Sequence, residues 1–126
     1  MNQEEIDELY TLLAEWEGWT GIFKFTHLLG YDPNPIYDKD CVCKSKLPDY
    51  CYDIRATEKL LTKAIEEGMY PLLGYVNEQY RPLLNIESGW MFILKDSTYE
   101  GVGPTIPMVV ADTIGRYLKD KKIIDK

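Results

Sequence analysis

The sequence predicts an α+β protein, a three-layer helix/sheet/helix sandwich with a small, mainly antiparallel sheet and about three helices. Three observations predict this fold. Three segments repeat apolar residues at helical spacing, two segments between the last two of them have strand-like composition, and both faces of those strands are apolar. Apolar residues on both faces are typical of a sheet that is covered on both sides. A chain of 126 residues is the size of one domain, so we expect a single domain spanning 1–126.

The first predicted helix is NQEEIDELYTLLAEWEG. Its apolar residues recur at intervals of three and four, and carboxylates lie between them. Asn2 suits the N-cap because its side chain can accept a hydrogen bond from an early backbone N–H. Gly18 suits the left-handed conformation that ends many helices.

The segment after this helix predicts a short strand and then a long loop. WTGIFKF has strand-like composition, whereas GYDPNPIYDKD contains two prolines, a glycine and an asparagine and must turn. We therefore expect a long loop at about 27–50. Loops of this length in compact domains are often functional.

The second predicted helix begins at Asp53, whose carboxylate can cap the first turn, and ends at Gly68. YPLLGYVN and GWMFILKD then form two predicted antiparallel strands. Alternation puts Leu72, Gly74 and Val76 on one face of the first strand. Pro82, in the intervening EQYRPLLNIES, interrupts any regular ladder.

The third predicted helix runs from about Ile106 to Lys121. Thr105 is the candidate N-cap, and Pro107 fits the first turn, where N–H groups lack helical partners.

Two stretches carry a resemblance to a known family. PDYCYDIRATEKLL and GVGPTIPMVVADTIGRYL, with Thr105 and Pro107, resemble elements of the phage ABA sandwich domain family, and AEWEGW is similar to the end of its first helix. The resemblance implies the order helix, strand, helix, two strands, helix, and a virus or prophage origin. It implies no activity. The chain departs from the family in its long loop and at Cys51, where a small polar residue is usual.

Charge and composition limit the classes of partner that the sequence favours. The net charge of -7 disfavours binding to a long nucleic acid, which relies on clustered lysine and arginine. The acidic N-terminus is unlike a signal peptide, and no segment approaches a membrane span. An odd number of cysteines argues against a secreted disulfide framework. We expect a cytoplasmic protein, in the host cell if it is phage-encoded, without a membrane partner.

Metal binding and catalysis have weak signals. Cys41, Cys43 and Cys51, with His27, are the right residue types for zinc, but C-x-C is closer than the usual ligand spacing. Ordinary loop thiols are favoured, so we expect no metal site. The aspartates at 32, 38, 40, 49 and 53 leave a divalent cation open. With one histidine and no nucleophile motif, the sequence favours a protein that is not an enzyme, with no catalytic residues and no cofactor.

The candidate ligand-binding residues are cations, tyrosines and glycines. Arginines and lysines can bind phosphate, tyrosines can stack on a base, and glycines before a helix can admit an anion to its N-terminal N–H groups. These candidates are Lys24, Arg55, Tyr80, Arg81, Tyr99, Gly101, Gly103 and Thr105. For the glycines, the alternative is that they merely shape a tight connection.

Two functional hypotheses follow. The first is an accessory protein that binds or sequesters a small host ligand, for which a nucleotide immune signal is one candidate, and so acts against host defence. The second is a protein-interaction module that inhibits or recruits a host protein through its acidic surface and long loop. Its many tyrosines also favour self-association into a homo-oligomer.

Overall fold

The computed structural model describes residues 2–33, 44–85, 89–94 and 99–124. They fall into two compact units, Met1–Asp49 and Tyr50–Lys126, and each unit is described below by itself. The single domain spanning 1–126 stays a prediction.

The first unit begins with α1 (Gln3–Trp16), the helix expected from the sequence. The side chain of Asn2 accepts a hydrogen bond of 2.8 Å from the backbone N–H of Glu5, which confirms the predicted N-cap. Gly18 follows the helix with a φ of 100°, a conformation that glycine adopts without a steric cost. Leu9 and Leu13 are buried.

A three-stranded antiparallel sheet completes this unit, with strands β1 (Thr20–Lys24), β2 (Leu28–Tyr31) and β3 (Ser45–Lys46) in that order. β1 is the strand predicted from WTGIFKF. The other two strands lie inside the segment for which we expected a loop. They are short and carry little periodicity, and β3 is recognisable only from its pairing with β2. The expectation of a loop is thus corrected at β2 and β3, and residues 34–43 of that range lie outside the described residues.

In the second unit, α2 (Ile54–Glu66) and α4 (Ile106–Ile124) are the other two predicted helices. The carboxylate of Asp53 accepts a hydrogen bond of 2.9 Å from the N–H of Arg55, as expected of an N-cap. The hydroxyl of Thr105 accepts one of 3.4 Å from the N–H of Met108.

The sheet of this unit has the order β4-β5-β6, and both pairs are antiparallel. β4 (Leu72–Tyr75) and β5 (Trp90–Leu94) are the two predicted strands. β6 (Tyr99–Gly103) was not expected, because its two glycines are typical of a loop. Between β4 and β5 the chain forms a 3-10 turn, η1 (Glu78–Tyr80), and a short helix, α3 (Arg81–Leu84).

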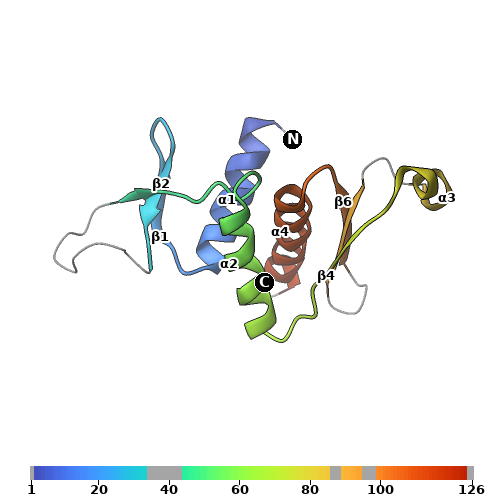
Figure 1. The fold of residues 1–126 in the computed structure, drawn as a ribbon. Helices are drawn as coiled ribbons and strands as arrows, with labels where there is room; N and C mark the ends of the chain where they lie inside the picture. The colour runs from blue at the N-terminus through green and yellow to red at the C-terminus, as the bar shows by residue number, and fades with distance from the viewer. Residues whose placement is uncertain (1, 34–43, 86–88, 95–98, 125–126) are drawn as a thin grey trace. The chain divides into compact units, whose positions relative to one another are not determined.

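The core of the second unit lies between its sheet and its helices. α4 packs against β5 and β6, and α2 packs against α4. The side chains of Phe92 and Leu94 on β5 are fully buried, as is Ile114 on α4. The layers of this unit therefore run sheet, α4, α2, with the second helix on α4 and not on the opposite face of the sheet (Figure 1).

The described residues contain four α-helices and two small antiparallel sheets, which confirms the predicted α+β class. Among them, no helix has both the length and the apolar character needed to cross a membrane.

Candidate functional site

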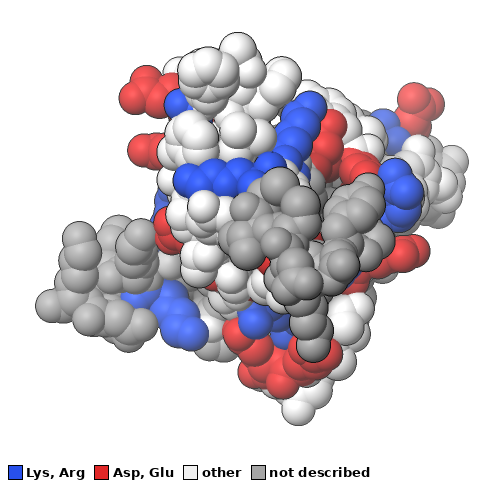
Figure 2. Space-filling model, turned by 90° about the vertical axis from the view of Figure 1, so that its left-hand side faces the viewer, with Lys and Arg blue, Asp and Glu red and all other residues white. Residues whose placement is uncertain are grey.

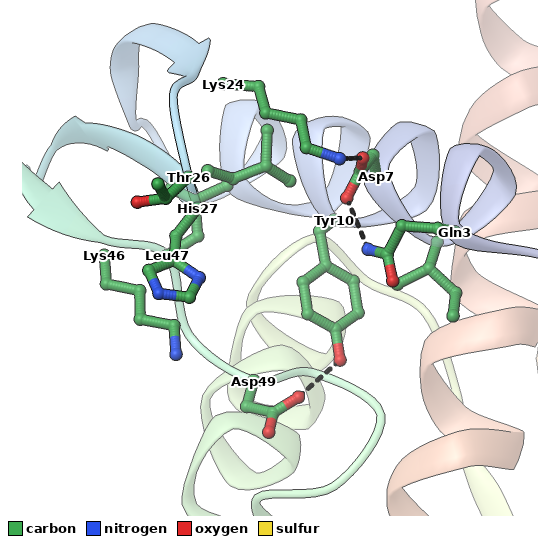
Figure 3. Close-up of a pocket in the computed structure, with 11 residues that line it drawn as sticks. Gln3, Asp7, Tyr10, Lys24, Thr26, His27, Lys46, Leu47 and Asp49 are labelled. Atoms are coloured by element: carbon green, nitrogen blue, oxygen red, sulfur yellow. Dashed lines mark hydrogen bonds and ion pairs between the residues drawn. The ribbon is translucent and has the colours of Figure 1, made fainter.

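The first unit contains a cavity of about 350 Å³. Helix α1, the ends of β1 and β2 with the turn between them, and the chain from the end of β3 to Asp49 line it with both charged and apolar side chains (Figure 3). Its lining residues are Gln3, Ile6, Asp7, Tyr10, Lys24, Thr26, His27, Leu28, Lys46, Leu47 and Asp49. This volume is at the lower end of the range for pockets that bind small molecules.

Helical spacing explains the contribution of α1. Gln3, Asp7 and Tyr10 are separated by four and three residues, so their side chains share one face of the helix. A turn positions the opposite wall: the N–H of Phe25 donates to the carbonyl of His27 at 3.0 Å. The backbone N–H of Leu47 donates to the carbonyl of Leu28 at 3.2 Å. This bond holds the residues after β3 against the start of β2, next to the turn.

Asp7 is the best-coordinated carboxylate of the cavity. It accepts a hydrogen bond from the ammonium of Lys24 and a second one, of 2.9 Å, from the Nε2 of Gln3. The hydrogen bond from Lys24, followed by that from Gln3, lowers the pKa of Asp7 below its ordinary value. Asp7 is therefore ionised at neutral pH, and its charge is matched by Lys24.

Asp49 is the other carboxylate of the cavity. The hydroxyl of Tyr10 donates to its Oδ1 at 2.5 Å (Figure 3). The aspartates that line the cavity are thus both engaged by groups of the protein itself.

Lys46 and His27 are in a different situation. Both line the cavity across from Tyr10 (Figure 3). Within the part of the chain that the structure describes, neither the Lys46 ammonium nor the His27 imidazole has a hydrogen-bond or ion-pair partner in the protein. These donors are available to a ligand that brings its own acceptor, above all an anion.

Of the residues predicted from the sequence to bind a ligand, Lys24 lines this cavity, as part of its ion pair with Asp7. Arg55 lies elsewhere, on the surface of α2. Its side chain is 85% exposed, and its guanidinium is 3.4 Å from the carboxylate of Asp53, two residues away. This is an ordinary surface ion pair.

Tyr80 and Arg81 lie beyond the end of β4. The guanidinium of Arg81 donates to the carbonyl of Val76 at 3.1 Å and to the hydroxyl of Tyr75 at 2.9 Å. Arg81 thus holds its own segment against the end of β4 through these two hydrogen bonds. Tyr80 is 50% exposed and lines a second, shallow hollow of about 450 Å³. The same hollow is lined by Tyr75, Val76, Asn77 and Leu83.

Tyr99 lies at the other end of this sheet, where β6 pairs with Leu94, the last residue of β5. Its ring meets that of Tyr117 edge to face, with 5.4 Å between the ring centroids. Desolvation, with a hydrogen bond to Asp120, raises the pKa of Tyr99. Because the length of β5 separates Tyr99 from Arg81, the structure does not bring these two candidates together.

Gly101 and Gly103 lie in β6 and not in the predicted connection, directly under α4. A Cβ atom at Gly101 would be 2.1 Å from the Oγ1 of Thr113, and one at Gly103 would be 3.1 Å from the Cβ of Val109. Close approach of helix and strand explains both glycines. Thr105 caps α4 as predicted.

Metal ligation is described only in part. Cys51 is buried. Cys41 and Cys43, like Asp38 and Asp40, lie outside the described residues. Among the residues that are described, no group of three or more histidine, cysteine, aspartate or glutamate side chains is arranged to hold a metal ion.

Comparison of the chain with protein-family models, with curated proteins and with solved structures found no match. A proposal about function therefore rests on the geometry of the chain itself. The resemblance to the phage ABA sandwich family stays a prediction.

Sequence reasoning missed most of the cavity. Tyr10 falls on the apolar stripe of α1, which gives no sign of its contact with Asp49, and His27 was weighed only as a zinc ligand and as a catalytic histidine. Gln3 and Asp7 did leave a signal, since polar residues four apart share a helix face. Lys46 left none, because its place in the cavity depends on the pairing of β3 with β2.

Proposed function

We propose that the cavity of the first unit binds a small metabolite that carries an anionic group, a phosphate or a carboxylate. One observation carries this proposal: the two carboxylates of the cavity are engaged by Lys24 and Tyr10, whereas Lys46 and His27 line the cavity without described partners. An anionic group placed beside Lys46 and His27 receives charge-assisted hydrogen bonds.

The size and lining of the cavity support a small polar ligand. A volume of about 350 Å³ accommodates a group such as a sugar phosphate or part of a nucleotide. Tyr10 offers an aromatic surface and Asp49 an acceptor to the uncharged part of the ligand. A nucleotide, including a nucleotide immune signal of the host, remains within the proposed ligand class.

The distribution of surface charge also supports a small ligand over a long nucleic acid. The lysine and arginine side chains visible in Figure 2 are interspersed with aspartates and glutamates and form no broad basic face there. Tracking a nucleic-acid backbone requires clustered cations.

Isothermal titration of the whole protein with inorganic phosphate, nucleoside monophosphates and small dicarboxylates tests the proposal. At least one of these ligands should bind, and Lys46→Ala should weaken its binding by about tenfold or more, because a charge-assisted hydrogen bond is lost. His27→Ala should weaken it less. Lys59→Ala, an exposed lysine on α2, is the matched control and should leave the affinity unchanged.

Equal affinity of the wild type and Lys46→Ala for a bound ligand would assign that ligand to another site. If Arg55→Ala weakens binding while Lys46→Ala does not, the surface of α2 is the binding region. No binding by any compound of the panel would exclude the proposed ligand class.

Protein interaction is the second candidate function, and the hollow beside η1 favours it. Tyr75, Tyr80 and Leu83, which line this hollow, are 55%, 50% and 80% exposed. Aromatic residues are enriched at protein interfaces. Tyr80→Ala and Leu83→Ala should reduce the recovery of a host protein in a pull-down, while Lys46→Ala should not. Recovery that survives both hollow variants would place the interface elsewhere.

A further inference from the structure

β4 is an outer strand of its sheet. Its hydrogen bonds to β5 show which backbone N–H and C=O groups of β4 point away from the sheet. The backbone N–H of Val76 donates to the carbonyl of Gly89 on the β5 side at 2.7 Å. In an antiparallel pair, successive residues point their backbone groups alternately toward and away from the partner strand. Gly74 therefore bonds toward β5, like Val76, and the N–H and C=O groups of Leu73 and Tyr75 point outward.

Among the residues that the structure describes, no group bonds to these outward N–H and C=O groups. Within the described residues, no backbone hydrogen bond joins Leu73 or Tyr75 to an element outside the sheet. Proteins usually protect such an edge with a lysine, a proline or a bulge. β4 has none of these, and no charged residue occurs between Met69 and Asn77. The edge is therefore open to another strand.

We propose that β4 pairs antiparallel with β4 of a second copy of this chain, around a two-fold axis at Gly74. In this register Leu73 lies opposite the partner's Tyr75, and Tyr75 opposite the partner's Leu73. Each of these pairs exchanges both backbone hydrogen bonds across the interface. The two sheets of the second units join into one continuous sheet.

The sequence of β4 is complementary to itself in this register. Leu72 lies opposite the partner's Val76, and Leu73 opposite the partner's Tyr75, so every side-chain pair that flanks the axis is apolar. Cross-strand apolar pairs stabilise a sheet, and like charges placed opposite each other destabilise it. Leu72 is 63% exposed and Tyr75 55%, so the pairing also removes apolar surface from water.

Gly74 suits the position on the axis. It falls in a pair without mutual hydrogen bonds, where the two backbones approach most closely. A Cβ atom at Gly74 would have no atom of its own chain within 4 Å. Pro71, which lacks an N–H, limits the ladder at its end.

The net charge opposes contact between two copies at most surfaces, and the edge of β4 is an exception. Each chain carries a charge of -7, so two copies repel each other over most of their surfaces. The uncharged stretch from Met69 to Asn77 is a place where they meet without opposing carboxylates. The two-fold pairing uses the β4 edge of both copies, and this isologous interface is closed at two copies. This inference does not depend on the cavity of the first unit.

Analytical ultracentrifugation of the full chain at micromolar concentration tests the dimer. The wild type should sediment as a dimer. Gly74→Lys places two ammonium groups opposite each other on the axis and should raise the dimer dissociation constant by about tenfold or more. Gly74→Thr, its matched control, adds a β-branched side chain without charge and should leave the dimer intact. Circular dichroism should show the same fold in all three proteins.

A wild type that sediments as a monomer across the concentration range would overturn the proposal. A dimer that persists unchanged in Gly74→Lys would overturn it as well, since the copies would then meet at another surface.

Disulfide crosslinking tests the register. In a closely spaced antiparallel pair the backbones lie within the range that a disulfide spans. Under mild oxidation Gly74→Cys should therefore yield a dimer linked through the two introduced thiols, as identified by peptide mass mapping. Leu72→Cys, whose thiol lies opposite the partner's Val76, should yield little. The wild type treated in parallel measures linkage through its own cysteines. More linkage through Leu72→Cys than through Gly74→Cys would overturn the two-fold register.

Discussion

Gly101 and Gly103 show how single residues set the spacing of the second unit. Both lie in β6 at points where α4 approaches the strand. Thr113, on the facing side of α4, is fully buried, and its hydroxyl donates to the carbonyl of Val109 at 2.8 Å. The guanidinium of Arg116 donates to the carbonyl of Glu100, which joins helix and strand beside this contact. There is no space for a side chain between the two elements.

Gly101→Ala should therefore destabilise the protein. The added methyl group would lie 2.1 Å from the Oγ1 of Thr113, and overpacking of this kind typically costs about 1–3 kcal/mol in the free energy of unfolding. Urea denaturation of the wild type and the variant measures this difference in the free energy of unfolding. Gly74→Ala is the control, since its Cβ meets no atom within 4 Å.

The double variant Gly101→Ala with Thr113→Ala should recover part of this loss, because it removes the atom that the new methyl group would strike. If Gly101→Ala and Gly74→Ala have equal stability, the close helix-strand contact does not constrain position 101.

At the scale of elements, the N-cap of α2 links helix stability to pH. The hydrogen bond from the Arg55 N–H is the main cause that lowers the pKa of Asp53 below its ordinary value of 3.8. The ionised carboxylate thus stabilises the folded state above the unfolded pKa. Its contribution disappears as the pH falls through the lowered pKa of the folded state.

Asp53→Ala should lower the melting temperature at neutral pH by a few degrees, because the first turn of α2 loses its cap. Asp53→Asn keeps a capping oxygen and does not titrate. The melting temperature of the wild type should therefore fall more steeply than that of Asp53→Asn as the pH is lowered from about 5 toward the lowered pKa of Asp53. Parallel profiles of these two proteins would show that Asp53 does not couple folding to pH.

The elements that the sequence predicted are those whose signals are local. All three long helices carry their own cap and apolar period, so Asn2, Asp53 and Thr105 marked their starts correctly. β6 was missed because its glycines reflect the approach of α4, a contact with a segment later in the chain. The cavity was missed for the same reason, since its walls come from three separate segments. Contacts between distant segments leave no periodic trace in the sequence.

At the scale of the whole molecule, net charge is the dominant electrostatic property. The chain has 21 acidic and 14 basic side chains, so its charges repel one another in the compact state. Raising the salt concentration from about 20 mM to about 200 mM should raise the melting temperature, because salt screens this repulsion.

A variant with Glu58→Lys and Glu66→Lys provides the comparison. Both glutamates are exposed on α2, and each substitution adds two charges, which changes the net charge from -7 to -3. Its melting temperature should respond less to salt than that of the wild type. An equal response would mean that net repulsion does not set the salt dependence.

Because Cys51 is buried, the reactivity of its thiol can report local opening of the second unit. The side chain is 2% exposed, and a thiol reacts with an alkylating reagent only when the reagent reaches it. Alkylation at this position, followed by mass spectrometry in excess reagent, therefore counts the openings of the segment that leads into α2. The rate of labelling therefore measures the rate of local unfolding around Cys51 in the native protein.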